Sequence, residues 1–277
     1  MNVRGLRIAS QIFFFMLSWM GIVIGMTGLI YPYFFCVACP YAFAACPIGM
    51  LEWAFIPVYN ALIILLYLIS FILLMGVIFG RAFCGWACPV GLIMDIMYRI
   101  RPFFFFLSPL YKKGLRIAEK MPSIPNPKYY KYMILILIPV TSFIGHKMAF
   151  TRIDPVGFIF ASIPQTVIGG YRPTVWYWVK LFLFLLVMAG ALSVRRSFCR
   201  FVCPLGALYA PMNKISMTRI TVDENKCVRC MMCRKACPMG VNIPESKRSA
   251  ECILCGRCVD ACNFDAIHIT FLDKRVI

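Results

Sequence analysis

The chain has 277 residues, of which 61% are hydrophobic and 14% are charged, and its mean hydropathy is +0.79. A soluble domain is about half apolar and about a quarter charged, so this composition excludes an ordinary soluble protein and predicts a membrane protein. The net charge of +18 does not indicate nucleic-acid binding, because the basic residues lie mostly beside apolar segments and follow no groove-tracking pattern.

Four apolar segments predict four membrane-spanning helices, at about residues 8–31, 53–80, 132–150 and 175–194. Each is close to the roughly 20 residues that a helix needs to cross the hydrocarbon core. The first segment is too long for the apolar part of a cleavable signal, so it is expected to remain as a span. Residues 1–219 are therefore predicted to form an all-α four-helix transmembrane bundle.

The distribution of basic residues predicts the orientation of this bundle. Arg4 and Arg7 precede the first span, and residues 81–131 hold nine Lys or Arg against two acids. An excess of basic residues marks the cytoplasmic side of a membrane protein. We therefore expect a multi-pass protein of the cell membrane, embedded in the lipid bilayer, with both termini in the cytoplasm.

Three cysteines, Cys36, Cys39 and Cys46, follow the first span on the expected outer side. Three thiolates are an incomplete ligand set for a cubic cluster, so a metal centre here needs a fourth ligand from elsewhere in the chain or from a partner subunit. A disulfide between two of them is the alternative, because this side of the membrane can be oxidising.

The same phrase follows the second and fourth spans: Phe83-Cys84-Gly-Trp-Ala-Cys88-Pro-Val-Gly91 and Phe198-Cys199-Arg-Phe-Val-Cys203-Pro-Leu-Gly206. A repeat at equivalent points of two hairpins predicts that the two motifs meet at the inner membrane surface. Cysteines four residues apart share a helical face, so we expect the four thiolates to bind a third metal centre. The alternative is a set of packing or redox-active thiols, since free cysteine is often buried as a small apolar residue.

Residues 220–277 predict a small α+β domain of the bacterial two-cluster ferredoxin type. The domain contains two consecutive runs of four cysteines, at spacings of two, two and three intervening residues, which is the ligand pattern of two 4Fe-4S clusters. In this pattern the fourth cysteine of each run binds the other cluster. The expected ligands are Cys227, Cys230, Cys233 and Cys262 for cluster 1, and Cys252, Cys255, Cys258 and Cys237 for cluster 2.

Together these motifs resemble the NapH-like membrane subunits of quinol dehydrogenases linked to periplasmic nitrate reduction, and the related polyferredoxin half of NosR-type regulators. The resemblance covers nearly the whole chain in architecture, and the run Cys203-Pro-Leu-Gly-Ala-Leu-Tyr209 is especially similar. It implies that electrons are taken from quinol and passed to partner redox subunits. It also implies that Cys84, Cys88, Cys199 and Cys203 are the family's inner-face cysteines. The outer trio is not a feature associated with the nitrate-linked members.

The sequence thus predicts a membrane-anchored iron–sulfur electron-transfer subunit of an oxidoreductase complex. Its exchangeable partner would be membrane quinone, and its protein partners would be catalytic or cytochrome subunits. Quinone chemistry needs a group that exchanges protons, for which Glu52, His146 and Asp154 are the candidates near the outer interface. With only His146 and His268 in the chain, a bis-histidine haem is excluded. The alternative function is that of a redox-sensing or assembly protein without a catalytic relay role.

Overall fold

The computed structural model describes residues 3–24, 46–56, 61–107, 129–167, 170, 172–245, 248–272 and 274–276. Helices dominate the part of the chain that precedes the C-terminal sheet. In chain order they are α1 (Val3–Ile24), α2 (Pro47–Ala54), α3 (Ala61–Phe79), α4 (Ala82–Trp86), α5 (Pro89–Leu107), α7 (Tyr130–Gly145), α8 (Ala149–Ile153), α9 (Pro155–Gly157), the π-helical turn η2 (Phe158–Ser162), α10 (Ile163–Val167), α11 (Val175–Ser193), α12 (Ser197–Phe201), α13 (Pro204–Tyr209) and α14 (Met212–Ile215).

Within the described ranges, two helices, α3 and α11, are long and apolar enough to cross a membrane, and α7 is apolar but shorter. Their large apolar side chains point outward: Leu62 on α3 is 70% exposed and Phe182 on α11 is 65% exposed. Such side chains would be buried in a soluble protein, whereas a bilayer can solvate them. The four-span arrangement remains a prediction.

The helix bounds differ from the predicted spans at several ends. α1 ends at Ile24, and residues 25–31 of the first predicted span lie outside the described ranges. The segment predicted as one helix from residue 53 holds the end of α2 and, from Ala61, all of α3. α7 stops at Gly145 because His146 takes a left-handed backbone conformation with φ 48°, which ends a helix.

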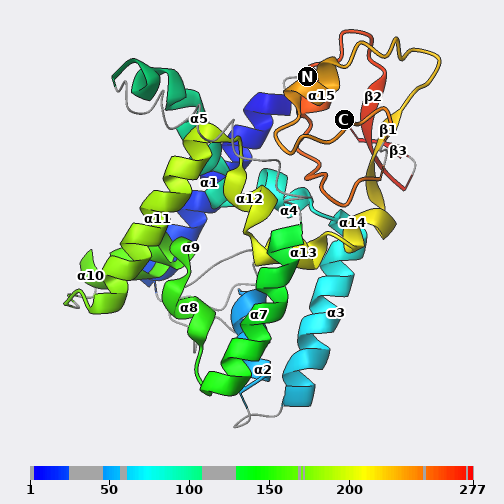
Figure 1. The fold of residues 1–277 in the computed structure, drawn as a ribbon. Helices are drawn as coiled ribbons and strands as arrows, with labels where there is room; N and C mark the ends of the chain where they lie inside the picture. The colour runs from blue at the N-terminus through cyan, green and yellow to red at the C-terminus, as the bar shows by residue number, and fades with distance from the viewer. Residues whose placement is uncertain are drawn as a thin grey trace.

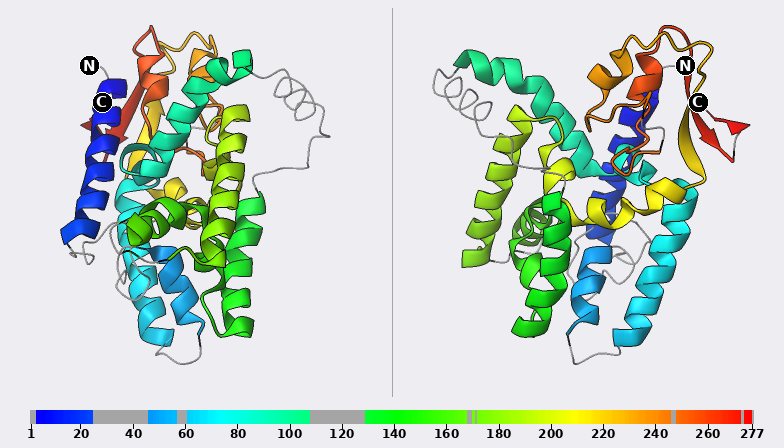
Figure 2. Two further views of the ribbon diagram at one scale, coloured as in Figure 1. Left: turned by 90° about the vertical axis from the view of Figure 1, so that its left-hand side faces the viewer. Right: turned by 45° about the vertical axis from the view of Figure 1, so that its right-hand side comes forward.

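The helices run lengthwise and the sheet lies at one end of the molecule (Figure 1). α3, α7 and α11 extend away from that end, while both termini of the chain lie beside it (Figure 2). The short helices α4, α12 and α13 lie between the long helices and the sheet. The two repeated cysteine motifs, which include these short helices, therefore lie next to the C-terminal domain.

The C-terminal domain is α+β, as the cysteine pattern predicts. Strands β1 (Thr218–Val222), β2 (Ile267–Phe271) and β3 (Lys274–Arg275) form an antiparallel sheet in that order. β1 pairs with β2 in the register Ile220 to Ile269. Two short helices, α15 (Met232–Ala236) and α16 (Arg257–Asp260), each contain the third cysteine of one run. The paired strands β1 and β2 thus bring together the two ends of the segment that carries both cysteine loops.

Candidate iron–sulfur sites

The two cysteine loops of the C-terminal domain share one backbone conformation. The residue before the second cysteine is left-handed in both, at Arg229 (φ 52°) and Leu254 (φ 51°), and so is the residue after it, at Met231 (φ 59°) and Gly256 (φ 73°). Left-handed backbone is unfavourable for residues other than glycine and collects at functional sites. Identical strain in both loops indicates that each is shaped to turn its cysteines toward a bound group.

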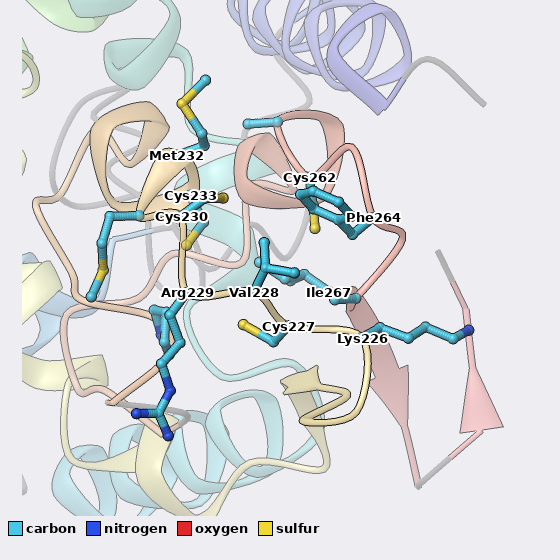
Figure 3. A pocket seen from close by; sticks show the side chains of 14 residues that line it. Lys226, Cys227, Val228, Arg229, Cys230, Met232, Cys233, Cys262, Phe264 and Ile267 are labelled. Carbon is cyan, nitrogen blue, oxygen red and sulfur yellow. The ribbon is translucent and has the colours of Figure 1, made fainter.

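The cysteines expected to hold cluster 1 surround one pocket (Figure 3). Cys227, Cys230, Cys233 and Cys262 all line it, and their sulfur atoms turn toward a shared space. Three of them come from the first loop and Cys262 comes from the end of the second, as the exchange of fourth ligands requires. Cys230 is exposed, so this pocket lies at the surface of the domain.

The cysteines expected to hold cluster 2 also lie together, but they are more deeply buried. Burial, together with the neighbouring Cys255 and Cys237, raises the pKa of the Cys252 thiol to about 12. Burial and the neighbouring Cys255, Cys252 and Cys237 raise the pKa of the Cys258 thiol in the same way. Such thiols keep their protons at neutral pH unless a metal replaces them, so the pocket favours thiolates only when metal is bound.

The two repeated motifs each consist of one short helix and the start of the next. Cys84 lies on α4 and Cys199 on α12, whereas Cys88 and Cys203 lie just before α5 and α13. The expectation that both cysteines of a motif share one helical face is therefore wrong, because the short helices end before the second cysteine. Proline is the first residue of each following helix, where its missing N–H is not needed.

The glycine of each motif contacts the cysteine three residues before it. The Gly206 N–H donates to Cys203 Sγ at 3.3 Å, and Gly91 makes the equivalent backbone hydrogen bond to Cys88. The same arrangement occurs at Cys46, where the Gly49 N–H donates to Sγ at 3.3 Å. A Cys-Pro-x-Gly sequence in this chain thus starts a helix and supplies one N–H to the sulfur.

The structure brings the four motif cysteines together. Burial raises the pKa of the Cys203 thiol well above its ordinary value, and the neighbouring Cys199, Cys84 and Cys88 raise it further. Burial, with Cys199 and Cys84 beside it, likewise raises the pKa of Cys88 to about 12. All four sulfurs are thus close enough to act on one another.

Two arginines that the sequence analysis missed cross between the motifs. Arg81 and Arg196 each precede the first cysteine of their own motif by three residues and are fully buried. A Cβ on Gly206 would meet Arg81 Nη2 at 2.9 Å, and one on Gly91 would meet Arg196 Nη2 at 3.1 Å. Each guanidinium therefore lies against the glycine of the other motif. The sequence did contain a signal for these arginines, because the repeat extends upstream as Arg-x-Phe-Cys in both copies.

The residues around these four cysteines fit a cluster. Three buried donors, Arg81 Nε, Arg196 Nε and Tyr209 Oη, have no hydrogen-bond partner among the described residues. Tyr209 lies beside Cys84, since that thiol adds to burial in raising the tyrosine's pKa. Buried unpaired donors are rare and costly, and the sulfur atoms of an iron–sulfur cluster would accept from them.

The spacing of the sulfurs also bears on the kind of centre. In the described part of the chain, no group of three or more His, Cys, Asp or Glu side chains is close enough to bind a single metal ion. The four cysteines of a cubic cluster bind four different irons and so lie farther apart than the ligands of one ion. A cubic cluster at the four motif cysteines would therefore not require their sulfurs to converge on one ion.

The first motif packs directly on the second cysteine loop of the C-terminal domain. A Cβ on Gly85 would lie 2.3 Å from the carbonyl oxygen of Ile253 and 3.3 Å from Cys255 Cβ. Trp86 Nε1 donates to the carbonyl of Leu254 at 2.8 Å, and Asn213 Nδ2 donates to the carbonyl of Cys252 at 3.0 Å. The segments that carry the motif cysteines and the cluster 2 cysteines are thus in van der Waals contact.

Two partly buried carboxylates connect the C-terminal domain to the helices through cations. Glu251 pairs with Arg81 at 3.2 Å and with the buried Lys131. Asp95 on α5 pairs with three arginines through the same oxygen, at 2.8 to 3.2 Å. These are Arg7, Arg196 and Arg257. Both networks carry more positive than negative charge, which suits the neighbourhood of anionic clusters.

The candidates near the opposite end of the molecule are only partly gathered. Cys36 and Cys39 lie outside the described ranges, and Cys46 is buried at the start of α2. The outer cysteine centre therefore remains a prediction.

The proposed proton-exchanging acids cap short helices in the structure, Glu52 from the distant α2 and Asp154 as the residue that precedes α9. Glu52 accepts hydrogen bonds from the Phe150 N–H at 2.7 Å and from the Ser142 hydroxyl at 3.3 Å. Asp154 accepts from the N–H groups of Val156 and Gly157 at the start of α9. His146 is exposed at the end of α7. The two acids thus have structural roles, and their part in a quinone site remains a prediction.

Two family models match the chain. One, described as a 4Fe-4S binding domain, matches residues 60–113 and 176–222, and the other, described as a 4Fe-4S dicluster domain, matches residues 219–263. The dicluster match contains the eight C-terminal cysteines. The first match contains four cysteines, and these are Cys84, Cys88, Cys199 and Cys203.

Several curated proteins are similar to the chain. An uncharacterized protein of Methanocaldococcus jannaschii is 32% identical over 203 residues, which cover 73% of this chain and 70% of that protein. The ferredoxin-type protein NapH of Escherichia coli is 30% identical, over 69% of this chain and 62% of NapH. The methylamine utilization ferredoxin-type protein MauN of Methylorubrum extorquens is 29% identical, over 64% of this chain and 51% of MauN. No solved structure matches the chain.

Proposed function

Because the chain belongs to the family of ferredoxin-type proteins that includes NapH and MauN, we propose that it relays electrons between membrane quinone and partner redox subunits of a respiratory complex. Iron–sulfur clusters would supply the one-electron steps of this relay. The protein would hold them in order, from the four motif cysteines through the buried second set to the exposed first set.

The observation that carries this proposal is the contact between the first motif and the second cysteine loop. Gly85 leaves room for the Ile253 carbonyl, and Trp86 bonds to Leu254, so no layer of side chains separates the two sets of ligands. Centres on touching segments are close enough for direct electron tunnelling. A sensor needs no such continuous path, which favours the relay over the alternative of a sensing or assembly protein.

The proposal includes a third cluster, held by Cys84, Cys88, Cys199 and Cys203. It is supported by the convergence of these cysteines, by the unpaired donors around them and by the 4Fe-4S family match over both motifs. Arg81 and Arg196 would offset part of its negative charge. Each arginine already pairs with one carboxylate, Arg81 with Glu251 and Arg196 with Asp95, and the third cluster would add a second anionic neighbour.

Iron content tests this third cluster. Purified protein is expected to hold about twelve irons per chain, and the double variant Cys84→Ser with Cys199→Ser about eight. The double variant should keep the electron paramagnetic resonance signals of the two C-terminal clusters, because their eight ligands are untouched. About eight irons in both proteins would contradict the third cluster and leave the C-terminal pair intact.

The partner side of the relay would be the exposed first set. Two exposed basic side chains, Lys226 and Arg229, line its pocket, and Arg234 and Lys235 are exposed on α15, the helix that carries Cys233. Positive charge at a docking surface speeds the approach of an acidic partner and makes the rate depend on salt. This surface therefore suits an acidic redox subunit.

The quinone side has a candidate next to Cys84. An apolar groove runs between α1, α4 and the C-terminal domain, and its lining includes Phe14, Phe79, Phe83, Trp86 and Leu254. Phe83 directly precedes Cys84, so a quinone ring here would lie beside the motif cysteines. Among the lining residues Thr218 is the polar one, so protons released from quinol would pass to water at the mouth of the groove.

A substitution of Tyr209 tests whether the third cluster lies beside this residue. Its hydroxyl is expected to donate to the third cluster, and hydrogen bonds to cluster sulfur raise the reduction potential. Tyr209→Phe should therefore lower the reduction potential of the third cluster and leave the potentials of the C-terminal pair unchanged. Redox titration monitored by electron paramagnetic resonance measures these potentials. Equal shifts at all centres would point to a general structural effect instead.

A quinol assay tests the relay itself. The purified protein, mixed with a soluble quinol analogue under anaerobic conditions, is expected to bleach its cluster absorption within the time of mixing. Clusters that stay oxidised with every quinol analogue, yet are reduced by dithionite, would rule out quinol as the donor.

A further inference from the structure

A basic cleft lies between the membrane helices and the C-terminal domain. Its volume is about 360 Å³, which is within the range of small-ligand sites. α1, α5 and the residues after α11 form one wall, and α16 forms much of the other. Its charged lining residues are Arg4, Arg99, Arg195, Arg257, Asp95 and Asp260.

Both acids of this cleft already have partners. Asp95 pairs with Arg257 at 2.9 Å, in addition to the buried Arg7 and Arg196. Asp260 accepts from the backbone N–H groups of Val3 and Arg4, at 3.2 and 2.9 Å, at the start of α1. Asp95 is shared among three arginines, and the four arginines of the lining outnumber its two carboxylates, so the cleft keeps a net positive charge.

Three guanidinium groups of the cleft lining form no direct ion pair among the described residues. Arg4, Arg99 and Arg195 make no ion pair with any residue in the described ranges. Arg195 is nonetheless held in place, because its guanidinium lies 4.8 Å from the centre of the Tyr98 ring. Arg4 and Arg99 are exposed and Arg195 is half-buried, so all three can reach an anion that enters from solvent, and their combined charge attracts one.

The position of the cleft identifies the anion. Arg195 follows Val194, the cap residue that ends the apolar helix α11, so it lies at the level where lipid headgroups meet the helix end. Arginine binds phosphate through paired N–H groups and is the preferred residue for this contact. We propose that the cleft binds the phosphate of an anionic phospholipid, and that this lipid links the C-terminal domain to the membrane helices.

This inference is independent of the proposed electron transfer, since none of its charged lining residues is a cysteine ligand. A lipid phosphate and free inorganic phosphate share the same chemistry, but the setting at the end of α11 favours the lipid. The lipid would supply negative charge in addition to that of Asp95 and Asp260, which the four arginines exceed. It would also contact both walls of the cleft at once.

Native mass spectrometry of the intact, cluster-loaded protein in mild detergent tests the site. Phosphatidylglycerol is expected to bind at one molecule per chain, and phosphatidylcholine is expected to bind much more weakly. The double variant Arg99→Gln with Arg195→Gln should weaken phosphatidylglycerol binding about 25-fold, at about fivefold for each arginine removed near a membrane surface. Arg152→Gln, which removes an exposed arginine outside the cleft, is the matched control and should bind as the unchanged protein does.

A charge-preserving variant and a competition with inorganic phosphate complete the experiment. Arg99→Lys with Arg195→Lys keeps both charges, so it should retain most of the binding even if the glutamine pair folds poorly, as judged by iron content. Displacement of the lipid by millimolar inorganic phosphate would support a phosphate site that is filled from solution. Equal binding of both lipids by the unchanged protein, or equal phosphatidylglycerol binding by the glutamine pair, would overturn the proposal.

Discussion

Replacing Gly85 with alanine is expected to separate the C-terminal domain from the first cysteine motif. The new Cβ would lie 2.3 Å from the carbonyl oxygen of Ile253, a backbone atom that cannot rotate away. Overpacking typically costs about 1–3 kcal/mol, and this contact should reach the upper end of that range. The expected result is a lower thermal midpoint and faster tryptic release of the C-terminal domain.

Gly145→Ala is the matched control for this experiment. No atom lies within 4 Å of a Cβ at that position, which is the end of α7. Alanine there should leave proteolysis unchanged. If Gly85→Ala behaves as Gly145→Ala does, the first motif and the second cysteine loop are not in contact, and the relay loses its main support.

Asp95→Asn is expected to be among the most destabilising single changes in the protein. The asparagine keeps the shape of the side chain but leaves Arg7, Arg196 and Arg257 without their shared carboxylate. Removing one partner from a buried ion pair costs on the order of 3–5 kcal/mol. We expect the thermal midpoint to fall by roughly 10 °C, measured on the protein in detergent.

The pH dependence of this effect follows from the charges around Asp95. Burial alone would raise the pKa of its carboxyl, but Arg196, Arg257 and Arg7 hold the pKa below its ordinary value of 3.8. A lowered folded-state pKa means that the stabilisation is complete above a pH of about 4 and is lost only as the pH falls through that lower pKa. The difference between Asp95→Asn and the unchanged protein should therefore be constant from pH 5 to pH 8.

Asp265→Asn serves as the control for the loss of a carboxylate. Asp265 pairs with Arg275 in a well-exposed position, where water screens the interaction. Its removal should change the thermal midpoint little. A difference for Asp95→Asn that varies with pH between 5 and 8 would mean that another titrating group, and not Asp95, controls the contact.

The cysteine sets could be predicted from the sequence because their spacing is local. Runs such as Cys227-x-x-Cys230-x-x-Cys233 fix the ligands of a loop whatever the rest of the chain does, and the repeat after two apolar spans predicts that the motifs meet. The structure does gather Cys84, Cys88, Cys199 and Cys203. It also forms the α+β C-terminal domain.

The surroundings of the cysteines could not be predicted because they depend on contacts between distant segments. Arg81 reaches Gly206 and Arg196 reaches Gly91 across more than a hundred residues of sequence. The left-handed backbone at Arg229, Met231 and Leu254 contradicts the local preference of those residues. Helical periodicity also misplaced Cys88, because proline at residue 89 starts a new helix instead of following an old one.

The acids chosen for quinone chemistry illustrate a different limit. Glu52 and Asp154 were selected because charged residues are scarce near the spans, yet each accepts backbone N–H groups at the start of a short helix. A sequence does not distinguish a capping carboxylate from a proton acceptor when the helix it caps is only a few residues long. The groove beside Cys84 is lined mainly by apolar residues, so no charged residue in the sequence pointed to it.

Asp260 contacts the start of α1, although the ribosome makes these two parts of the chain at very different times. Its carboxylate holds the first N–H groups of α1, from a position 257 residues later in the chain. At about 5–20 residues per second, the ribosome needs roughly 10–50 s to make that distance. During that time α1 has no partner for these N–H groups. Only a folded C-terminal domain can cap the first turn of α1, so the folding of that domain and the ordering of this turn are coupled.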